Sequence, residues 1–131
     1  MSAANGSETL GAKKPLVLVV DDEPFIRQMI RIALRRQFDI VEAGSAEEAL
    51  AVIDRSPALR AVVSDARMPG AGGIELMMEV QRRFPTIRRL LVSGYTCENA
   101  DRLLREGIID KFLEKPLDVR EISSALRGLV P

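Results

Sequence analysis

The sequence predicts an α/β domain, in which one parallel β-sheet is covered by helices on both faces. Short apolar runs, typical of buried strands, alternate along the chain with stretches whose apolar residues have helical spacing. Each apolar run ends in polar residues, and the connections between the runs are short. Because strands joined through helices make right-handed crossovers, this alternation predicts a single parallel sheet of five strands.

The composition is typical of a globular protein with one domain. With 131 residues, the chain is long enough for one core and too short for two. Its residues are 47% hydrophobic and 29% charged, which is ordinary for a globular protein. Residues 1–14 are mostly small and polar, so we predict a disordered tail there and the folded domain at residues 15–131. Lys+Arg and Asp+Glu number 19 each, so net charge gives no argument for a nucleic-acid or membrane partner.

Rare and absent residue types narrow the function further. Histidine is absent, which excludes histidine-based catalysis and histidine metal ligands within this chain. The single cysteine, Cys97, cannot form an internal disulfide, as expected of a protein in the reducing cytoplasm. No apolar run approaches the roughly 18 residues of a membrane span, and the chain does not begin with a signal peptide.

Two strand–helix units are predicted in the first half of the chain. Leu16 to Val20 is an apolar strand, and Pro24 suits the first turn of the following helix. The apolar residues of that helix recur at helical spacing: Ile26, Met29, Ile30, Ala33 and Leu34. Another face carries Arg27, Arg31 and Arg35, which we interpret as a solvated face rather than a docking surface. Asp39 to Ala43 is the next strand, and Ser45 with Glu48 has the spacing of a capping box that opens a second helix.

Three further units follow. Arg60 to Asp65 contains the apolar run of a buried strand, and Pro69 with the glycines after it forces a loop. The next helix has four inward apolar residues: Leu76, Met77, Val80 and Phe84. Arg89 to Val92 is the fourth strand.

The last part of the chain is less apolar. Thr96 to Glu106 is predicted as a weaker helix, with Gly107 as its cap and a thin apolar stripe: Ala100, Leu103 and Leu104. Lys111 to Glu114 alternates apolar and charged residues, which suits an edge strand. Asp118 caps a final helix.

The natural topology for these units is the flavodoxin-like doubly wound sheet, with strand order 2-1-3-4-5. In this order the first and third strands are neighbours, so Asp21, Asp22 and Asp65 meet at the carboxyl edge, where Ser93 and Lys115 also lie. Clustered carboxylates repel one another, and oxygen ligands without histidine or thiolate suit Mg²⁺, with Mn²⁺ as an alternative. An acceptor oxygen, a metal, an ammonium group and a hydroxyl are the parts that phosphoryl transfer needs.

The chain resembles the response-regulator receiver domains of two-component signalling. Four segments, spread over roughly residues 15 to 130, carry the resemblance. They are Val20-Asp-Asp-Glu-Pro24, Ser64-Asp65 with Met68-Pro-Gly70 and Gly73, Ser93-Gly94, and Phe112-Leu-Glu-Lys-Pro116.

The resemblance implies a role for each matching residue. Asp65 would accept the phosphoryl group, Lys115 would contact a phosphoryl oxygen, and Ser93 would hydrogen-bond the group. Asp22, Asp65 and the backbone carbonyl of Arg67 would bind Mg²⁺ directly, and Asp21 would act through water. Ser93 and Phe112 would form the switch pair. In the family the bond between Lys115 and Pro116 is often cis.

The resemblance also implies partners. A sensor histidine kinase or a phosphotransfer protein would donate the phosphoryl group, and an effector protein or output domain would read the altered surface. It allows a phosphorylation-dependent homodimer, and it implies no direct contact of this chain with nucleic acid or membrane. Arg67 and Tyr95 take positions that flank the phosphoryl group in the family. Gly94 departs from the alanine that the family favours.

Two other functions share parts of this pattern. A phosphatase of the haloacid dehalogenase type also uses an aspartate nucleophile with Mg²⁺, but it places a second acid where this chain has Arg67, and it needs a cap domain. A flavin-binding module would need aromatic residues around the ring, and the chain has one Tyr, four Phe and no Trp. The glycines at 70, 72 and 73 lack the third glycine of a dinucleotide fingerprint, because Glu75 stands there.

Overall fold

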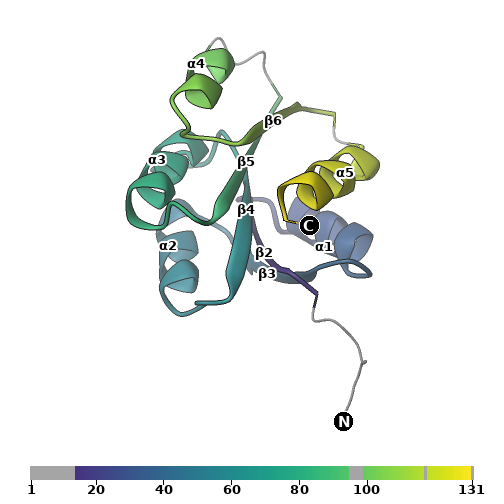
Figure 1. Ribbon diagram of the computed structural model, residues 1–131. Coiled ribbons are helices and arrows are strands. Elements are labelled where there is room, and N and C mark those ends of the chain that lie inside the picture. The colour runs from purple at the N-terminus through teal and green to yellow at the C-terminus, as the bar shows by residue number, and fades with distance from the viewer. Residues whose placement is uncertain (1–13, 95–98, 117, 131) are drawn as a thin grey trace.

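The computed structural model describes residues 14–94, 99–116 and 118–130. A five-stranded parallel sheet runs through the middle of the molecule (Figure 1). Its strands are β2 (Leu16–Val20), β3 (Asp39–Ala43), β4 (Leu59–Asp65), β5 (Arg88–Ser93) and β6 (Lys111–Glu114). The spatial order β3-β2-β4-β5-β6 confirms the predicted order 2-1-3-4-5 and makes β6 an edge strand.

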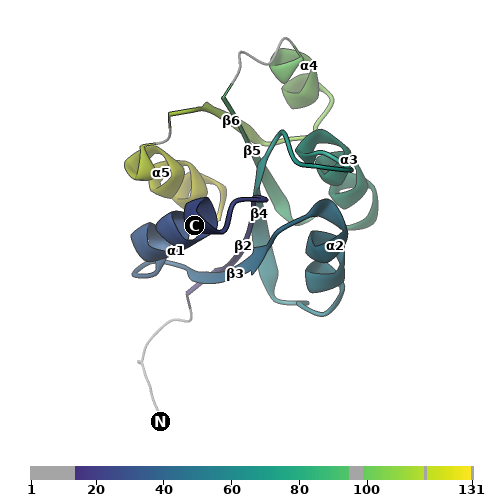
Figure 2. The ribbon, with the colours of Figure 1, turned by 180° about the vertical axis from the view of Figure 1, so that it is seen from behind.

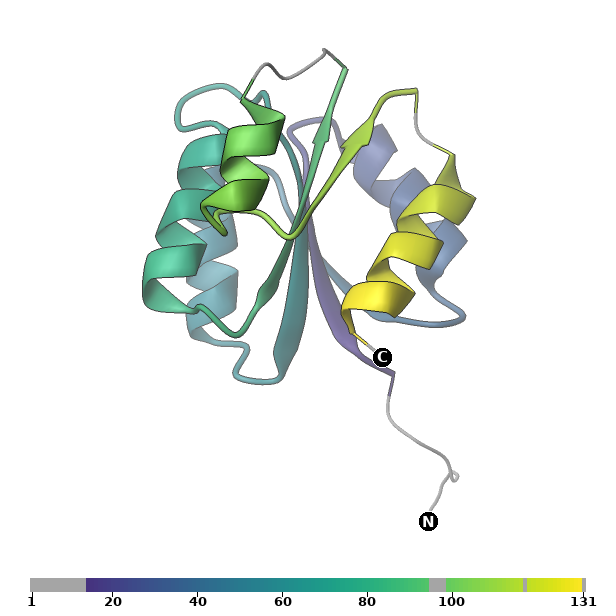
Figure 3. The ribbon, with the colours of Figure 1, turned by 45° about the horizontal axis from the view of Figure 1, so that its top comes forward.

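Helices cover both faces of the sheet (Figures 2 and 3). The helices are α1 (Pro24–Leu34), α2 (Ala46–Asp54), α3 (Gly73–Arg83), α4 (Ala100–Arg105) and α5 (Val119–Leu129). α1 and α5 lie on one face, and α2, α3 and α4 lie on the other. Within the described ranges, no helix has both the length and the apolarity to cross a bilayer.

The core is divided by the sheet into two apolar clusters. Val17 and Val19 of β2 belong to the cluster beneath α1 and α5, whereas Leu18 and Val20 belong to the cluster beneath α2 and α3. Successive side chains of a strand point to opposite faces, so one strand contributes to both clusters. This double burial explains why the central strands are continuous apolar runs.

Most of the predicted helix ends are confirmed. The Ser45 hydroxyl accepts a hydrogen bond from the Glu48 N–H at 3.1 Å, and the Glu48 carboxylate accepts one from the Gly44 N–H at 2.6 Å. The Asp118 carboxylate accepts from the Arg120 N–H at 2.9 Å and caps α5. Gly107 follows α4 with φ of +72°, a conformation that favours glycine.

Two predicted apolar stripes are narrower than expected. In α1, Ile30 and Leu34 are buried, but Met29 is 46% exposed and Ala33 is also exposed, so the predicted inward face is wrong at these two positions. In α4, Leu103 is buried and Leu104 is exposed. The first residues predicted for this helix, from Thr96, lie outside the described residues. Tyr95, Cys97 and residues 1–13 of the predicted tail 1–14 also lie outside them.

The first half of β5 contains a buried arginine that the sequence did not predict. Arg89 is only 5% exposed, and its guanidinium donates to backbone carbonyls of the two neighbouring connections: Pro85, Ile87, Gly107 and Ile108. Burial lowers the pKa of this guanidinium, against the opposing charge of Asp110 at 3.8 Å. Arg89 therefore joins the α3–β5 and α4–β6 connections at the edge of the sheet opposite the acidic residues.

Candidate phosphoryl-acceptor site

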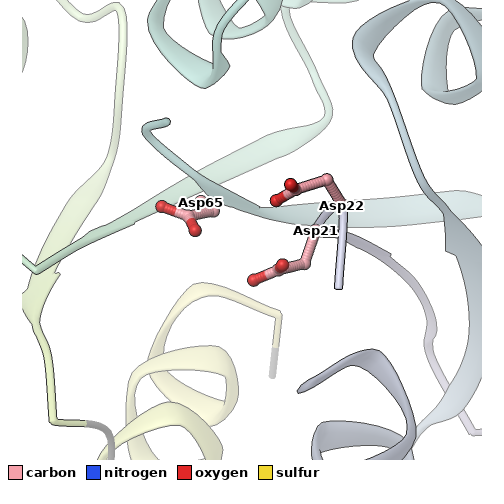
Figure 4. A group of neighbouring side chains, drawn as sticks. All are labelled: Asp21, Asp22 and Asp65. Atoms are coloured by element: carbon pink, nitrogen blue, oxygen red, sulfur yellow. The ribbon is translucent and has the colours of Figure 1, made fainter. Parts of the chain in front are cut away.

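Three carboxylates meet where β2 and β4 end. Asp21 and Asp22 follow β2, and Asp65 is the last residue of β4, whose Ser64 pairs with Val20 of β2. One carboxylate oxygen from each acid lies within 4.8 Å of the others. Figure 4 shows the three side chains gathered at this edge. The structure therefore brings together the three acids that the sequence analysis selected.

The Asp65 carboxylate is held from two sides. One oxygen accepts a hydrogen bond from the Arg67 N–H at 3.2 Å, and the other accepts one from the Lys115 ammonium at 3.0 Å. The backbone beyond it is also fixed, because the Ala66 N–H donates to the Val92 carbonyl at 2.7 Å. These contacts hold the carboxylate in a defined orientation before any ligand binds.

Because Gly73 has no side chain, the backbone of Asp65 can lie directly against it. The Gly73 N–H donates to the Ala66 carbonyl at 3.0 Å, which pulls the start of α3 against the end of β4. A Cβ atom at position 73 would lie 2.0 Å from the Asp65 carbonyl oxygen. Since backbone cannot move aside as easily as the end of a side chain, only glycine fits here. In the sequence Gly73 belongs to a motif, and its steric role becomes visible only where α3 packs against the end of β4.

Lys115 reaches the acids from the end of β6. Its N–H donates to the Ser93 carbonyl at 2.8 Å, and its ammonium lies 3.0 Å from Asp65 and 4.0 Å from Asp21. Burial by itself would lower the pKa of Lys115, but the hydrogen bond and charge of Asp65, with the charge of Asp21, outweigh it and raise this pKa. The lysine is therefore a fixed positive charge. The Lys115–Pro116 peptide bond is cis, as expected.

Asp21 is the most buried of the three acids. Its side chain accepts a hydrogen bond from the Glu23 N–H at 2.9 Å, and the residue is 3% exposed. Burial raises its pKa, and the charges of Asp65 and Asp22 add to the effect against the opposing Glu23 N–H and Lys115. The cluster thus holds negative charge that one lysine does not balance.

The substitution Asp21→Asn tests whether the negative charge of the cluster destabilises the fold, because it removes one charge and keeps an oxygen for the Glu23 N–H. Because the folded-state pKa of Asp21 is raised above 3.8, the unfolded chain ionises first, and the native state loses stability as pH rises through that range. Because asparagine does not ionise, the variant does not lose this stability. In the absence of Mg²⁺, urea unfolding should show Asp21→Asn more stable than the parent at neutral pH. The difference should shrink as pH falls to 3.8 and below, where both states bind the proton; a variant no more stable at neutral pH would contradict the argument.

The remaining predicted residues have defined places. Ser93 is buried at the end of β5, next to Lys115, and Phe112 lies half-buried in β6 against the cluster beneath α2 and α3. A Cβ atom on Gly94 would meet the Lys115 side chain only at ordinary contact distance, 3.8 Å, so the alanine favoured by the family would also fit. Tyr95 is among the residues that the structure does not describe.

The donor set fits a hard divalent cation. Three carboxylates offer oxygen atoms only, and the burial of Asp21 makes its ionised form costly without a cation nearby. Mg²⁺ prefers such oxygens and keeps several waters, which suits a site open to solvent at Asp22. The cluster is therefore of the kind that holds Mg²⁺.

A family model described as the response regulator receiver domain matches residues 17–127. The chain belongs to this family. Receiver domains act as phosphorylation-dependent signalling switches, and this membership favours the switch over a phosphatase of the haloacid dehalogenase type.

Relatives and solved structures agree with this assignment. The receiver domain is 38% identical over 105 residues to the hydrogenase transcriptional regulatory protein HoxA of Cupriavidus necator, covering 79% of this chain and 22% of HoxA. It is 33% identical over 118 residues to the photosynthetic apparatus regulatory protein RegA of Cereibacter sphaeroides, covering 89% of this chain and 63% of RegA. A response regulator receiver protein from Pseudomonas putida matches with a TM-score of 0.81 and 28% identity, over 89% of this chain and 98% of that one.

The chain thus spans between about a fifth and two thirds of the length of these two regulators.

Proposed function

We propose that this receiver domain accepts a phosphoryl group on Asp65 from a phosphohistidine of a sensor kinase or phosphotransfer protein. The observation that carries the proposal is the contact of the Asp65 carboxylate with the Lys115 ammonium at 3.0 Å, beside two further acids. A nucleophilic oxygen, a fixed cation and a cluster suited to Mg²⁺ are thereby brought to one edge of the sheet.

The chemistry follows from this arrangement. An Asp65 oxygen attacks phosphorus, the P–N bond of phosphohistidine breaks, and the nitrogen leaves with the electron pair. Lys115 faces one phosphoryl oxygen, and the Ser93 hydroxyl would donate to another. Bound Mg²⁺, held by Asp22, Asp65 and the Arg67 carbonyl with Asp21 through water, would neutralise phosphoryl charge. Attack of water on the acyl phosphate later restores Asp65 and releases inorganic phosphate, so the chain promotes its own modification without turning over a separate substrate.

The output is a change of surface. Phosphorylation adds about two negative charges and three acceptor oxygens at Asp65. Ser93 moving toward these oxygens would vacate space that Phe112 can fill, and the altered surface would comprise α4, β6 and α5. In the described part of α4, Leu103 is the one buried residue, so this helix is weakly held and free to respond. Such a switch is a two-state equilibrium biased by one covalent change.

The partners belong to the same proposal. The surface of α4, β6 and α5 would contact an effector protein or an output domain, or a second copy of the chain after phosphorylation. Neither nucleic acid nor membrane needs to contact this chain. We place the exchange in the cytoplasm, where a single cysteine stays reduced.

Beryllium fluoride, a phosphoryl analogue, tests the proposal. With Mg²⁺ present it should raise the melting temperature of the parent chain and shift amide resonances around Asp65, Ser93 and Lys115. A ligand that binds only the native state adds about 2.7 kcal/mol of stability at a hundredfold excess over its Kd. The shift should be lost when Mg²⁺ is removed. If beryllium fluoride with Mg²⁺ changes neither the melting temperature nor these resonances, the proposal is wrong.

An exposed apolar patch on α1 supports a protein partner at this edge. Phe25, Met29 and Ile32 are 65%, 46% and 53% exposed, and α1 begins at Pro24, two residues after the acidic pair. We expect Phe25→Ser to slow transfer from a kinase that phosphorylates the parent by about tenfold, a typical effect of losing one central contact. Labelling by acetyl phosphate, which needs no docking, should be unchanged.

Met78→Ser is the matched control for this patch. Met78 is 49% exposed but lies on α3, on the other face of the sheet. The variant Met78→Ser should accept the phosphoryl group from the kinase at the parental rate. Equal slowing by both substitutions would show that the α1 patch is not a docking surface.

A further inference from the structure

Arg27 does not lie on a solvated face, as its spacing with Arg31 and Arg35 had indicated. Its side chain is only 19% exposed and turns from α1 toward the end of β2. One terminal nitrogen donates to the backbone carbonyl of Asp21 at 2.6 Å, and Nε donates to the Glu42 carboxylate of β3 at 3.2 Å. The predicted solvated stripe is therefore wrong at this position.

We propose that Arg27 is a positioning residue that holds the acidic pair in the orientation required to bind Mg²⁺. This inference rests on the proposed metal site and adds to it a residue outside the ligand set. The Asp21 carbonyl belongs to the planar peptide unit that joins Asp21 to Asp22. Holding this carbonyl limits rotation of the peptide unit, and so fixes the direction in which the Asp22 carboxylate leaves the backbone.

The other polar groups of Asp21 are held independently. Its N–H donates to the Ala43 carbonyl at 3.2 Å, and its carboxylate accepts from the Glu23 N–H at 2.9 Å. The second contact closes a turn around Asp22, but it joins the Asp21 side chain to the Glu23 N–H and does not bind the carbonyl of the Asp21–Asp22 peptide unit itself. Arg27 binds this carbonyl directly, and so adds a second restraint to the peptide unit that carries the exposed Asp22.

The neighbourhood accommodates an arginine in particular. A Cβ atom on Gly44 would lie 3.2 Å from the Arg27 terminal nitrogen, closer than most such contacts, so the glycine leaves room for the guanidinium. A guanidinium presents several donors in a fixed plane, and here it reaches a carbonyl and a carboxylate at once. A lysine would offer one compact charge and could not hold both acceptors in this geometry.

Arg31 provides a matched control. It lies one turn further along α1 and pairs with the same Glu42 carboxylate at 2.6 Å, but it is 53% exposed. The variants Arg27→Gln and Arg31→Gln therefore each remove one positive charge and one partner of Glu42. They differ in the bond to the Asp21 carbonyl.

Calorimetric titration of the metal-free chain with Mg²⁺ alone is the test. Loss of a nearby positive charge should by itself strengthen cation binding in both variants. If Arg27 positions the acidic pair, Arg27→Gln should instead bind Mg²⁺ about tenfold more weakly, as is usual when a residue supporting a metal ligand is lost. Arg31→Gln should bind as tightly as the parent or more tightly. The Asp22 amide resonance should move in Arg27→Gln without metal, and stay in place in Arg31→Gln.

Other outcomes overturn the inference. Arg27→Gln binding Mg²⁺ with parental or higher affinity would show that the carbonyl contact does not matter. Equal weakening in both variants would assign the effect to Glu42. If Arg27→Gln does not fold, Arg27→Lys replaces it: charge is kept, affinity should still fall, and parental affinity would refute the role. A parent that binds no Mg²⁺ would refute the metal site itself, whereas binding unchanged by substitution refutes only the role of Arg27.

Discussion

Asp65→Asn is expected to abolish phosphoryl acceptance while leaving the fold intact. The side chain keeps its size and an oxygen for the Arg67 N–H, but an amide lacks the anionic oxygen that attacks phosphorus. It also loses the ion pair with Lys115, which lies at the edge of the sheet and is partly exposed. Incubation with acetyl phosphate and Mg²⁺, followed by intact-mass spectrometry, should show one added phosphoryl group on the parent and none on the variant.

Asp54→Asn controls for the loss of one aspartate. Asp54 ends α2 and pairs with Arg83 at 3.0 Å, remote from the three acids. This variant should be labelled like the parent. Labelling of Asp65→Asn at the parental level would place the acceptor elsewhere, and the account of this edge of the sheet would fail with it.

Gly73→Ala is expected to have the second large effect, on both stability and phosphoryl acceptance. The new methyl group would lie 2.0 Å from the Asp65 carbonyl oxygen, so either α3 or the end of β4 must shift. Forcing one extra carbon into a well-packed region typically costs about 1–3 kcal/mol, and a contact this short with backbone belongs at the upper end of that range. That is a large part of the roughly 5–15 kcal/mol by which domains are stable. Urea unfolding should show the loss, and labelling of Asp65 should slow because its backbone is displaced.

Gly128→Ala is the matched control, and it should change stability in the opposite direction. Gly128 lies within α5, and apart from its chain neighbours and the backbone of its own helix, no heavy atom lies within 4 Å of the position that its Cβ would take. Alanine there should stabilise the domain by about 1 kcal/mol, because it favours the helix more than glycine does. Similar stabilities for the two variants would mean that the contact at position 73 is readily relieved.

The strands and their order were predictable because the signals are local. β2 is apolar at every position and β4 contains a continuous apolar run at residues 61–63, as required when helices cover both faces. The caps at Ser45 and Asp118 lie within a few residues of the groups they bind. The convergence of the acids was predictable for a related reason. All strands of a parallel sheet end at the same edge, so a residue at a strand end is placed by topology alone.

Side-chain environments were predicted less well. Arg27 and Arg31 share one helix and one spacing, yet one is fixed beneath the acidic pair and the other is exposed. Met29 continues an apolar period but lies outward, and Arg89, where the fourth strand was predicted to begin, is buried and binds backbone carbonyls. Arg27 and Arg89 depend on partners that the helical or strand pattern does not reveal: the Asp21 carbonyl and Glu42 for Arg27, and the α4–β6 connection for Arg89.

Periodicity and residue type along the chain were thus enough to establish the order of the strands and the meeting of Asp21, Asp22 and Asp65. The packing of α1 against β2 and β3 decided that Arg27 binds the Asp21 carbonyl, and the approach of α3 to β4 decided that position 73 must be glycine. A strand end is placed by backbone hydrogen bonds that every residue can make. A side chain is placed by the particular atoms that surround it, and these come together only when the helices have packed onto the sheet.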